Sequence, residues 1–324
     1  MDNNKPLVSV CMITYNHAPY LAQAIDTIVN QKTQYSFELV IGEDCSPADN
    51  TRAICEDYAA RYPNLIRLLP SDKNHGMVPN LIRTYKACRG EIIAITEGDD
   101  WWCDEQKLEK QVGFLVNNPD FSVCYTDMYQ QTGEVLTKIE TDLPDVSDIE
   151  YNLRNWDGYA ATSIVMRRYP DDFEFPEYNK YIKANDVFLR IMCLRYGKLK
   201  ILKGEFTTVY RQHEGGVMAT FRKDRDAYLL NNIFLLEKLD IILEGKYAKT
   251  IAEVKRGMYF LCGFFHLNND VNGKIEVKNF LKSWRNYPKV ARYFFKAGLP
   301  QVSRGFSSLA KRKVNQMSAV KRIS

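Results

Sequence analysis

Three carboxylates within four residues are the clearest chemical feature of this sequence. Glu97, Asp99 and Asp100 follow the apolar run Glu91–Thr96, and Gly98 lies between the first two. Residues two apart in an extended segment point to the same side, and glycine lets the backbone approach a bound group closely. Carboxylate oxygens are the preferred ligands of hard cations such as Mg²⁺ or Mn²⁺. The pattern predicts a divalent-metal site, and a solvated turn that caps the next helix is the alternative.

A second acidic pair follows another apolar run. Glu43 and Asp44 come shortly after Phe37–Ile41, and polar residues also follow the runs Leu7–Ile13 and Leu65–Leu69. The carboxyl ends of parallel strands meet at one edge of a sheet, where ligands bind. Two acidic strand ends at the same edge repel each other unless a cation or a donor-rich ligand is present.

The elements that must position these residues alternate between strand and helix periods. Strands are expected at 7–13, 37–41, 65–69 and 91–96, and helices from Pro19 and over Thr51–Arg61 and Pro79–Cys88. Such alternation is typical of β-α-β units in a mostly parallel sheet with helices on both faces. We therefore expect an α/β fold of the Rossmann-like kind.

The rhythm changes after Trp101. We expect a polar, turn-rich stretch over residues 130–160, and only helices from residue 224 onward. The other expected elements are helices Lys107–Asn117, Ala184–Tyr196, Asp224–Glu244 and Tyr247–Leu267, and strands Phe121–Tyr125, Ala161–Arg167, Lys200–Leu202 and Thr207–Arg211.

The composition is that of a globular protein. The chain has 324 residues, of which 45% are apolar and 26% charged, which excludes disorder, collagen and coiled coil as descriptions of the whole chain. Its eight cysteines contain no Cys-x-x-Cys pair, so we expect reduced thiols. No apolar stretch reaches the roughly 18 residues of a spanning helix, and we expect no signal peptide. Walker A and G-x-G-x-x-G motifs are missing, which argues against P-loop NTPases and dinucleotide dehydrogenases.

Four motifs in order resemble the N-terminal half of a family 2 glycosyltransferase of the GT-A fold. The resemblance covers about residues 6–130 and continues more weakly to about 215. Its motifs are Val8–Asn16, Glu43–Ser46, Asn74-x-Gly76 and Glu97–Trp102, with Asn185-Asp186 and Tyr210-Arg211-x-His213 in the continuation.

This resemblance implies a nucleotide-diphosphate sugar as donor. Thr14, Tyr15 and Asn16 would line the nucleotide pocket, and Asp44 would contact the base or ribose with Glu43 beside it.

Residues 97–99 correspond to the D-x-D element of the resembled family. Asp99 would hold the divalent ion, and Glu97, Gly98 and Asp100 would lie on the nucleotide sugar. Glutamate in place of the first aspartate is a departure that moves the carboxylate by about 1.5 Å. A direct role of Glu97 on the metal is therefore not expected.

An acceptor hydroxyl is a poor nucleophile, so a carboxylate must take its proton during attack. The resemblance places this base at Asp186, for which a helix-capping role is the alternative. One base and one metal suffice for single displacement with inversion.

Two further pairs receive roles. Arg211 would contact phosphate oxygens and His213 the metal or diphosphate, although a lone surface histidine is the alternative. Trp101 and Trp102 would stack on the acceptor sugar, or one would belong to the core. His17 also follows a strand end but receives no catalytic role.

Charge divides the chain unevenly. Residues 271–324 carry a net charge of +12, and residues 1–270 a net charge of −8. We expect a catalytic domain over 1–215 and a helical region with a basic tail over 216–324. Aromatic and basic residues together fit an anionic membrane surface; a solvated basic end is the alternative, and nucleic-acid binding is not expected.

The sequence thus predicts a metal-dependent, inverting glycosyltransferase that uses Mn²⁺ or Mg²⁺ and a UDP-sugar. A saccharide or lipid-linked saccharide would be its acceptor, in polysaccharide biosynthesis. We expect it in the cytoplasm, with peripheral contact at the inner face of the plasma membrane through the tail. A nucleotidyltransferase and an inactive sugar-nucleotide-binding scaffold are the alternatives.

Overall fold

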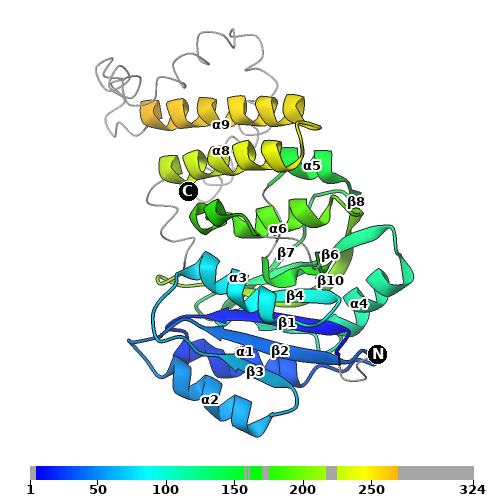
Figure 1. The fold of residues 1–324 in the computed structure, drawn as a ribbon, viewed down its shortest axis with the longest axis vertical. Helices are drawn as coiled ribbons and strands as arrows, with labels where there is room; N and C mark the ends of the chain where they lie inside the picture. The colour runs from blue at the N-terminus through cyan, green and yellow to red at the C-terminus, as the bar shows by residue number, and fades with distance from the viewer. Residues whose placement is uncertain (1–4, 157–158, 160, 170–174, 217–224, 269–324) are drawn as a thin grey trace, which may run out of the picture.

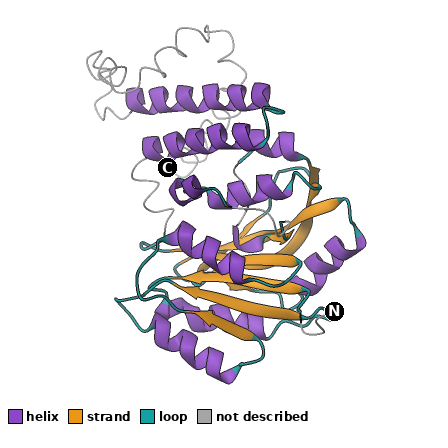
Figure 2. Ribbon diagram, viewed as in Figure 1, coloured by secondary structure: helices purple, strands orange, loops and turns teal. Residues whose placement is uncertain are grey.

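A computed structural model describes residues 5–156, 159, 161–169, 175–216 and 225–268. Its centre is a ten-stranded mixed sheet (Figures 1 and 2). The expected basic tail lies outside the described residues.

The first half of the sheet is parallel, as predicted. Strands β1 (Val8–Thr14), β2 (Phe37–Glu43), β3 (Ile66–Leu69) and β4 (Ile92–Glu97) pair in the order β3-β2-β1-β4. All seven residues of β1 are buried, because helices cover both faces of this strand. The chain order switches direction at β1, where open α/β sheets place their ligands.

Helices α1 (Ala18–Val29), α2 (Thr51–Arg61) and α4 (Lys107–Asn117) pack on one face of the sheet. Helices α3 (Met77–Ala87) and α6 (Asn185–Cys193) pack on the opposite face (Figure 1). The amphipathic pattern of α1 explains its place, since Leu21, Ile25 and Ile28 are all buried.

The second half of the sheet is mixed and continues the order as β9-β6-β10-β5. Strand β6 pairs parallel to β10 and antiparallel to β9. The bounds of these elements are β5 (Trp101–Trp102), β6 (Phe121–Thr132), β7 (Val135–Ile139), β8 (Val146–Ser147), α5 (Ile149–Arg154), η1 (Ala161–Ser163), β9 (Val165–Arg167), η2 (Glu177–Tyr181) and β10 (Lys198–Gln212).

Two predictions in this half were wrong in detail. Residues 130–160 contain the end of β6, β7, β8 and α5 instead of turns alone. The two strands expected at 200–202 and 207–211 are one strand, β10, whose register against β6 shifts between Leu202 and Thr208. These irregularities let a long strand bend and still keep its partner.

Helices α8 (Arg225–Ile242) and α9 (Ala248–Asn268) stack beyond α6 (Figure 1). Leu235, Leu236 and Leu239 of α8 belong to the same buried cluster as Phe188 of α6. The hydrophobic core therefore includes residues on both sides of position 215. The expected boundary between a catalytic domain and a helical region at this position stays a prediction. No helix in the described part of the chain is long and apolar enough to cross a membrane.

Continuous packing predicts that α8 unfolds together with the sheet. Leu236 is fully buried, so Leu236→Ala should lower the free energy of unfolding by about 2–5 kcal/mol. Urea unfolding followed by tryptophan fluorescence should show one transition at a lower midpoint. Ile241→Ala on the same helix is the control, because Ile241 is 68% exposed. A separate transition confined to the helices would contradict the prediction.

Candidate active site

The acidic turn after β4 lies at the switch in strand order, beside the end of β1. The Gly98 backbone N–H donates to the Ile13 carbonyl at 2.9 Å. A Cβ atom at position 98 would lie 2.5 Å from Oγ1 of Thr14, so this close approach requires glycine. The Thr14 hydroxyl is buried and has no hydrogen-bond partner. Thr14 and Gly98, two predicted site residues, are therefore in contact.

Asp99 lies between two imidazoles. Its Oδ2 atom is 3.0 Å from Nε2 of His213 and 3.6 Å from Nε2 of His17, while its Oδ1 atom is buried without a partner. Burial raises the pKa of Asp99, but the hydrogen bond from His213 and the interaction with His17 outweigh it and lower the pKa below its usual range. Asp99 is thus an ionised carboxylate with one oxygen available to a ligand.

Arg211 ties the end of β10 to the acidic turn. Its backbone N–H donates to Oδ1 of Asp100 at 2.8 Å, and its side chain donates to the Asp99 carbonyl and, at 2.7 Å, to Gln23. Its guanidinium also lies 4.5 Å from the ring centroid of Tyr20. These contacts use both terminal nitrogens, so Arg211 holds the turn in place, and its predicted phosphate contact stays a prediction.

Glu97 ends β4, and Asp186 lies in the first turn of α6. The predicted role of Asp186 as base stays a prediction. Burial, together with the negative charges of Asp99 and Asp186, raises the pKa of Glu97 to about 8. Glu97 therefore holds its proton over most of the neutral range. Burial and the charges of Asp99 and Glu97 likewise raise the pKa of Asp100.

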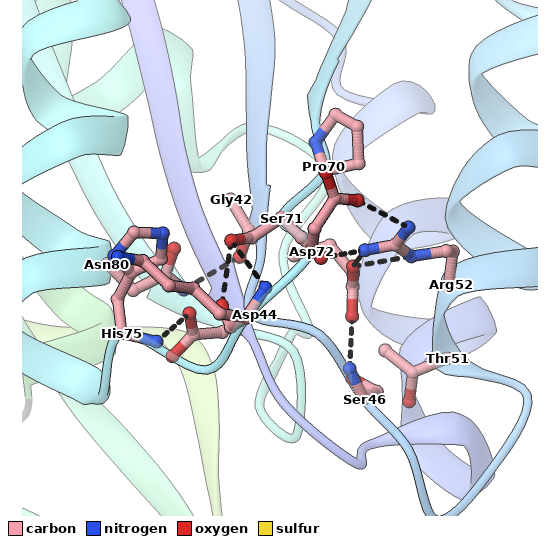
Figure 3. A network of polar contacts seen from close by, with 12 residues as sticks. Gly42, Asp44, Ser46, Thr51, Arg52, Pro70, Ser71, Asp72, His75 and Asn80 are labelled. Carbon is pink, nitrogen blue, oxygen red and sulfur yellow. Dashed lines mark hydrogen bonds and ion pairs between the residues drawn. The ribbon is translucent and has the colours of Figure 1, made fainter.

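Both carboxylates of the acidic pair at the end of β2 accept hydrogen bonds from neighbouring protein groups (Figure 3). Asp44 accepts hydrogen bonds from the backbone N–H groups of His75 and Gly76 at 2.8 and 2.9 Å. Glu43 accepts from the Ser46 N–H at 2.6 Å and from Nε of Arg52 at 2.9 Å. Both carboxylates thus fix the loops beside β2, and their predicted contact with the nucleotide stays a prediction.

Residues 15 and 16 form the turn after β1. The Tyr15 side chain is 38% exposed. Asn16 has φ of +53°, and its backbone N–H donates to Oγ of Ser46 at 3.0 Å. Asparagine tolerates this left-handed conformation better than most residues. The turn therefore presents the Tyr15 ring to solvent.

The two tryptophans have different surroundings. Trp102 is 2% exposed and packs in the core, so the expectation that it stacks on a sugar is wrong. Successive strand residues point to opposite faces, and in β5 this turns Trp102 inward. Trp101 is half-buried, and its Nε1 donates to Gln131 at 3.2 Å. The acceptor role stays a prediction for Trp101 alone.

Sequence reasoning missed three site residues at the start of α1. His17 lies beside Asp99, and the Tyr20 ring contacts both His213 and Arg211. Gln23 accepts a hydrogen bond from Arg211. His17, Tyr20 and Gln23 are three residues apart, a spacing that places them along one side of a helix. That spacing directly after the motif at 14–16 was the available signal.

The site has donors suited to a metal ion. Oδ1 of Asp99 is buried without a partner, and the His213 imidazole lies at Oδ2 of the same carboxylate, so the two residues supply donor types that fit a divalent cation. Within the described ranges, no three histidine, cysteine, aspartate or glutamate side chains form a group that could hold an ion unaided.

Comparison with known families decides the assignment. The model of glycosyl transferase family 2 matches residues 9–194, more than half of the chain. This chain belongs to glycosyl transferase family 2. The family match runs from β1 to the end of α6 and so includes Asp99 and Asp186.

Individual relatives agree with this membership. An uncharacterised protein of Mycobacterium bovis is 31% identical over 225 residues, 67% of this chain and 62% of that protein. The chain therefore matches less than two thirds of this relative's length. A Bacillus subtilis protein named as the teichuronic acid biosynthesis glycosyltransferase TuaG is 30% identical over 177 residues, 54% of this chain and 68% of TuaG.

A solved structure has the same fold as this chain. TarS 1–349 of S. aureus, in complex with UDP-GlcNAc, superposes with a TM-score of 0.63 and 16% identity. The match covers 87% of this chain and 81% of TarS 1–349. The fold is GT-A, as the sequence predicted.

The raised pKa of Glu97 predicts a pH-dependent stability. Its pKa is raised from 4.5 to about 8 in the folded chain, so the free energy of unfolding falls as pH rises through that window. Glu97→Gln should remove this pH-dependent fall in the free energy of unfolding, which is on the order of a few kcal/mol. In thermal unfolding with EDTA present, the melting temperature of the variant relative to that of the wild type should rise between pH 5 and pH 9.

Glu91→Gln is the matched control, because Glu91 is an exposed carboxylate next to the same strand. Parallel curves for wild type and Glu97→Gln would show that the buried proton is not at Glu97.

Proposed function

We propose that this chain is a metal-dependent, inverting glycosyltransferase that takes its sugar from a nucleotide-diphosphate donor. One observation carries the proposal: Asp99 keeps a free, buried carboxylate oxygen beside His213 at the switch point of a family 2 fold. The negative charge of Asp186, in the first turn of α6, acts on the Glu97 carboxyl. The site therefore combines a cation-binding carboxylate for the donor diphosphate with a second carboxylate for the acceptor hydroxyl.

The donor assignment rests on the position of the site and on a neighbour. Thr14 and Tyr15 end β1, where nucleotides bind in such sheets. TarS, which shares the fold, was crystallised with UDP-GlcNAc. A UDP-sugar is therefore the donor that we propose first.

The acceptor assignment rests on relatives alone. TuaG is named for teichuronic acid biosynthesis. We assign the chain to polysaccharide biosynthesis, with a saccharide or lipid-linked saccharide as acceptor. As part of the same proposal, we assign the protein to the cytoplasm, in peripheral contact with the inner face of the plasma membrane.

Asp99 and His213 are the residues that would hold Mn²⁺ or Mg²⁺, with substrate phosphate and water completing the coordination. The ion supplies charge neutralisation for the departing nucleoside diphosphate. Because Glu97 retains its proton at neutral pH, it can donate a hydrogen bond, and we assign it to the donor ribose.

Asp186 acts as the base in this proposal. It is half-buried in the first turn of α6, where the helix dipole favours a negative charge. As the acceptor hydroxyl attacks the anomeric carbon, its proton passes to the Asp186 carboxylate and the bond to the diphosphate oxygen breaks. A single displacement of this kind inverts the anomeric centre.

The function predicts donor binding and turnover that depend on Asp99. A panel of UDP-GlcNAc, UDP-glucose and GDP-mannose with MnCl₂ should raise the melting temperature for one donor, and that donor should be turned over with release of its nucleotide. Asp99→Ala should abolish release, whereas Asp120→Ala, which removes an exposed carboxylate, should not. Binding without turnover in the wild type would favour the scaffold alternative. Pyrophosphate release from UTP and a sugar phosphate would favour a nucleotidyltransferase.

The base assignment predicts a separation of binding from transfer. Asp186→Asn should lower the transfer rate about 10²–10⁴-fold and leave the donor dissociation constant unchanged, because the side chain keeps its size and loses its basicity. Calorimetry and nucleotide release measure the two quantities. Loss of donor binding in Asp186→Asn would argue against its role as base.

A further inference from the structure

Arg190 is a fully buried cation that the proposed chemistry does not use. It lies on α6 and is 0% exposed. Its guanidinium stacks 4.0 Å from the ring centroid of Tyr159, and Nη2 reaches the Trp156 carbonyl at 3.4 Å. Nε and Nη1 have no hydrogen-bond partner.

Such a group is costly to bury. Among the described residues, no carboxylate lies within 4.0 Å of the Arg190 guanidinium. An uncompensated buried charge destabilises a folded protein, and replacing it with an apolar side chain is often neutral or stabilising. Packing alone therefore does not explain an arginine at this position.

Asp186 lies one helical turn before Arg190 on α6. Asp186 and Arg190 are four residues apart, so they share a face of α6. Long side chains on a helix point back toward its N-terminus, which directs Arg190 under the turn that carries Asp186.

Tyr125 of β6 links the two charges. Its ring lies 4.9 Å from that of Tyr159, and its buried hydroxyl makes no hydrogen bond. Burial raises the pKa of Tyr125, the charge of Arg190 opposes this rise and the charge of Asp186 adds to it. Both charges thus act on the same buried hydroxyl.

We propose that Arg190 is a positioning residue for Asp186: its buried positive charge, one helical turn away and beside Tyr125, orients the base carboxylate toward the acceptor. This inference rests on the proposed function. Complete burial keeps Arg190 from contacting the substrate directly. Asp186 supplies a negative charge in the first turn of α6, and Arg190 supplies the opposing charge one helical turn later.

The test uses the full chain and the donor that responds in the panel, with nucleotide release to water or acceptor as the measurement. Arg190→Met should lower kcat about 10- to 100-fold, leave the donor KM unchanged, and leave the melting temperature equal or higher. Arg190→Lys, which keeps the charge, should recover most of kcat. Arg195→Met is the matched control, because Arg195 is exposed just beyond α6.

Coupling to the base is the decisive measurement. In the Asp186→Asn background, Arg190→Met should cause little further loss, because residues that act as a unit are not additive. If Arg190→Met does not fold, Tyr125→Phe takes its place in the same cycle with Asp186→Asn. A full additional loss in that background would overturn the inference.

Two other outcomes would also overturn it. A lower melting temperature with unchanged kcat would make Arg190 structural, and a raised acceptor KM with unchanged kcat would make it a substrate contact. Absence of turnover in the wild type would refute the proposed function itself. This outcome differs from one in which the wild type is active and only the inference about Arg190 fails.

Discussion

Asp99 and Asp100 are adjacent at the end of β4, and burying two neighbouring carboxylates is costly unless donors face them. The donors come from distant parts of the chain. The backbone and side chain of Arg211 contact both residues, and His213 contacts Asp99. The order of the sheet follows from this need, because β10 must run beside β5 for its last residues to reach the turn.

The same constraint explains why the site is asymmetric. Oδ2 of Asp99 is engaged by His213 and Oδ1 is free, so one carboxylate is both held and available. Glu97, two residues earlier, has no such donors and keeps its proton instead. Different surroundings therefore give neighbouring carboxyl groups of one short segment different charge states.

Prediction from sequence succeeded where periodicity was strong. Strands β1, β2 and β4 lie where the apolar runs placed them, since buried parallel strands leave a continuous apolar run. Helices α2 and α4 have the bounds expected from the polar and proline residues at their ends. It failed for β10, because a bent strand with register shifts has no regular period. It also failed to separate Trp101 from Trp102, since only the pairing of β5 with β10 decides which ring is buried.

The sequence by itself determined the family, the alternating fold and the acidic turn at 97–100, because these depend on residue types and short spacings. Only the tertiary structure showed that His17, Tyr20 and Gln23 join the site, that Arg211 holds the turn and that Arg190 of α6 is fully buried. Contacts between residues 99 and 211 depend on how β10 crosses the sheet. Local sequence carries no record of such long-range geometry, nor of the burial that changes the pKa of Glu97.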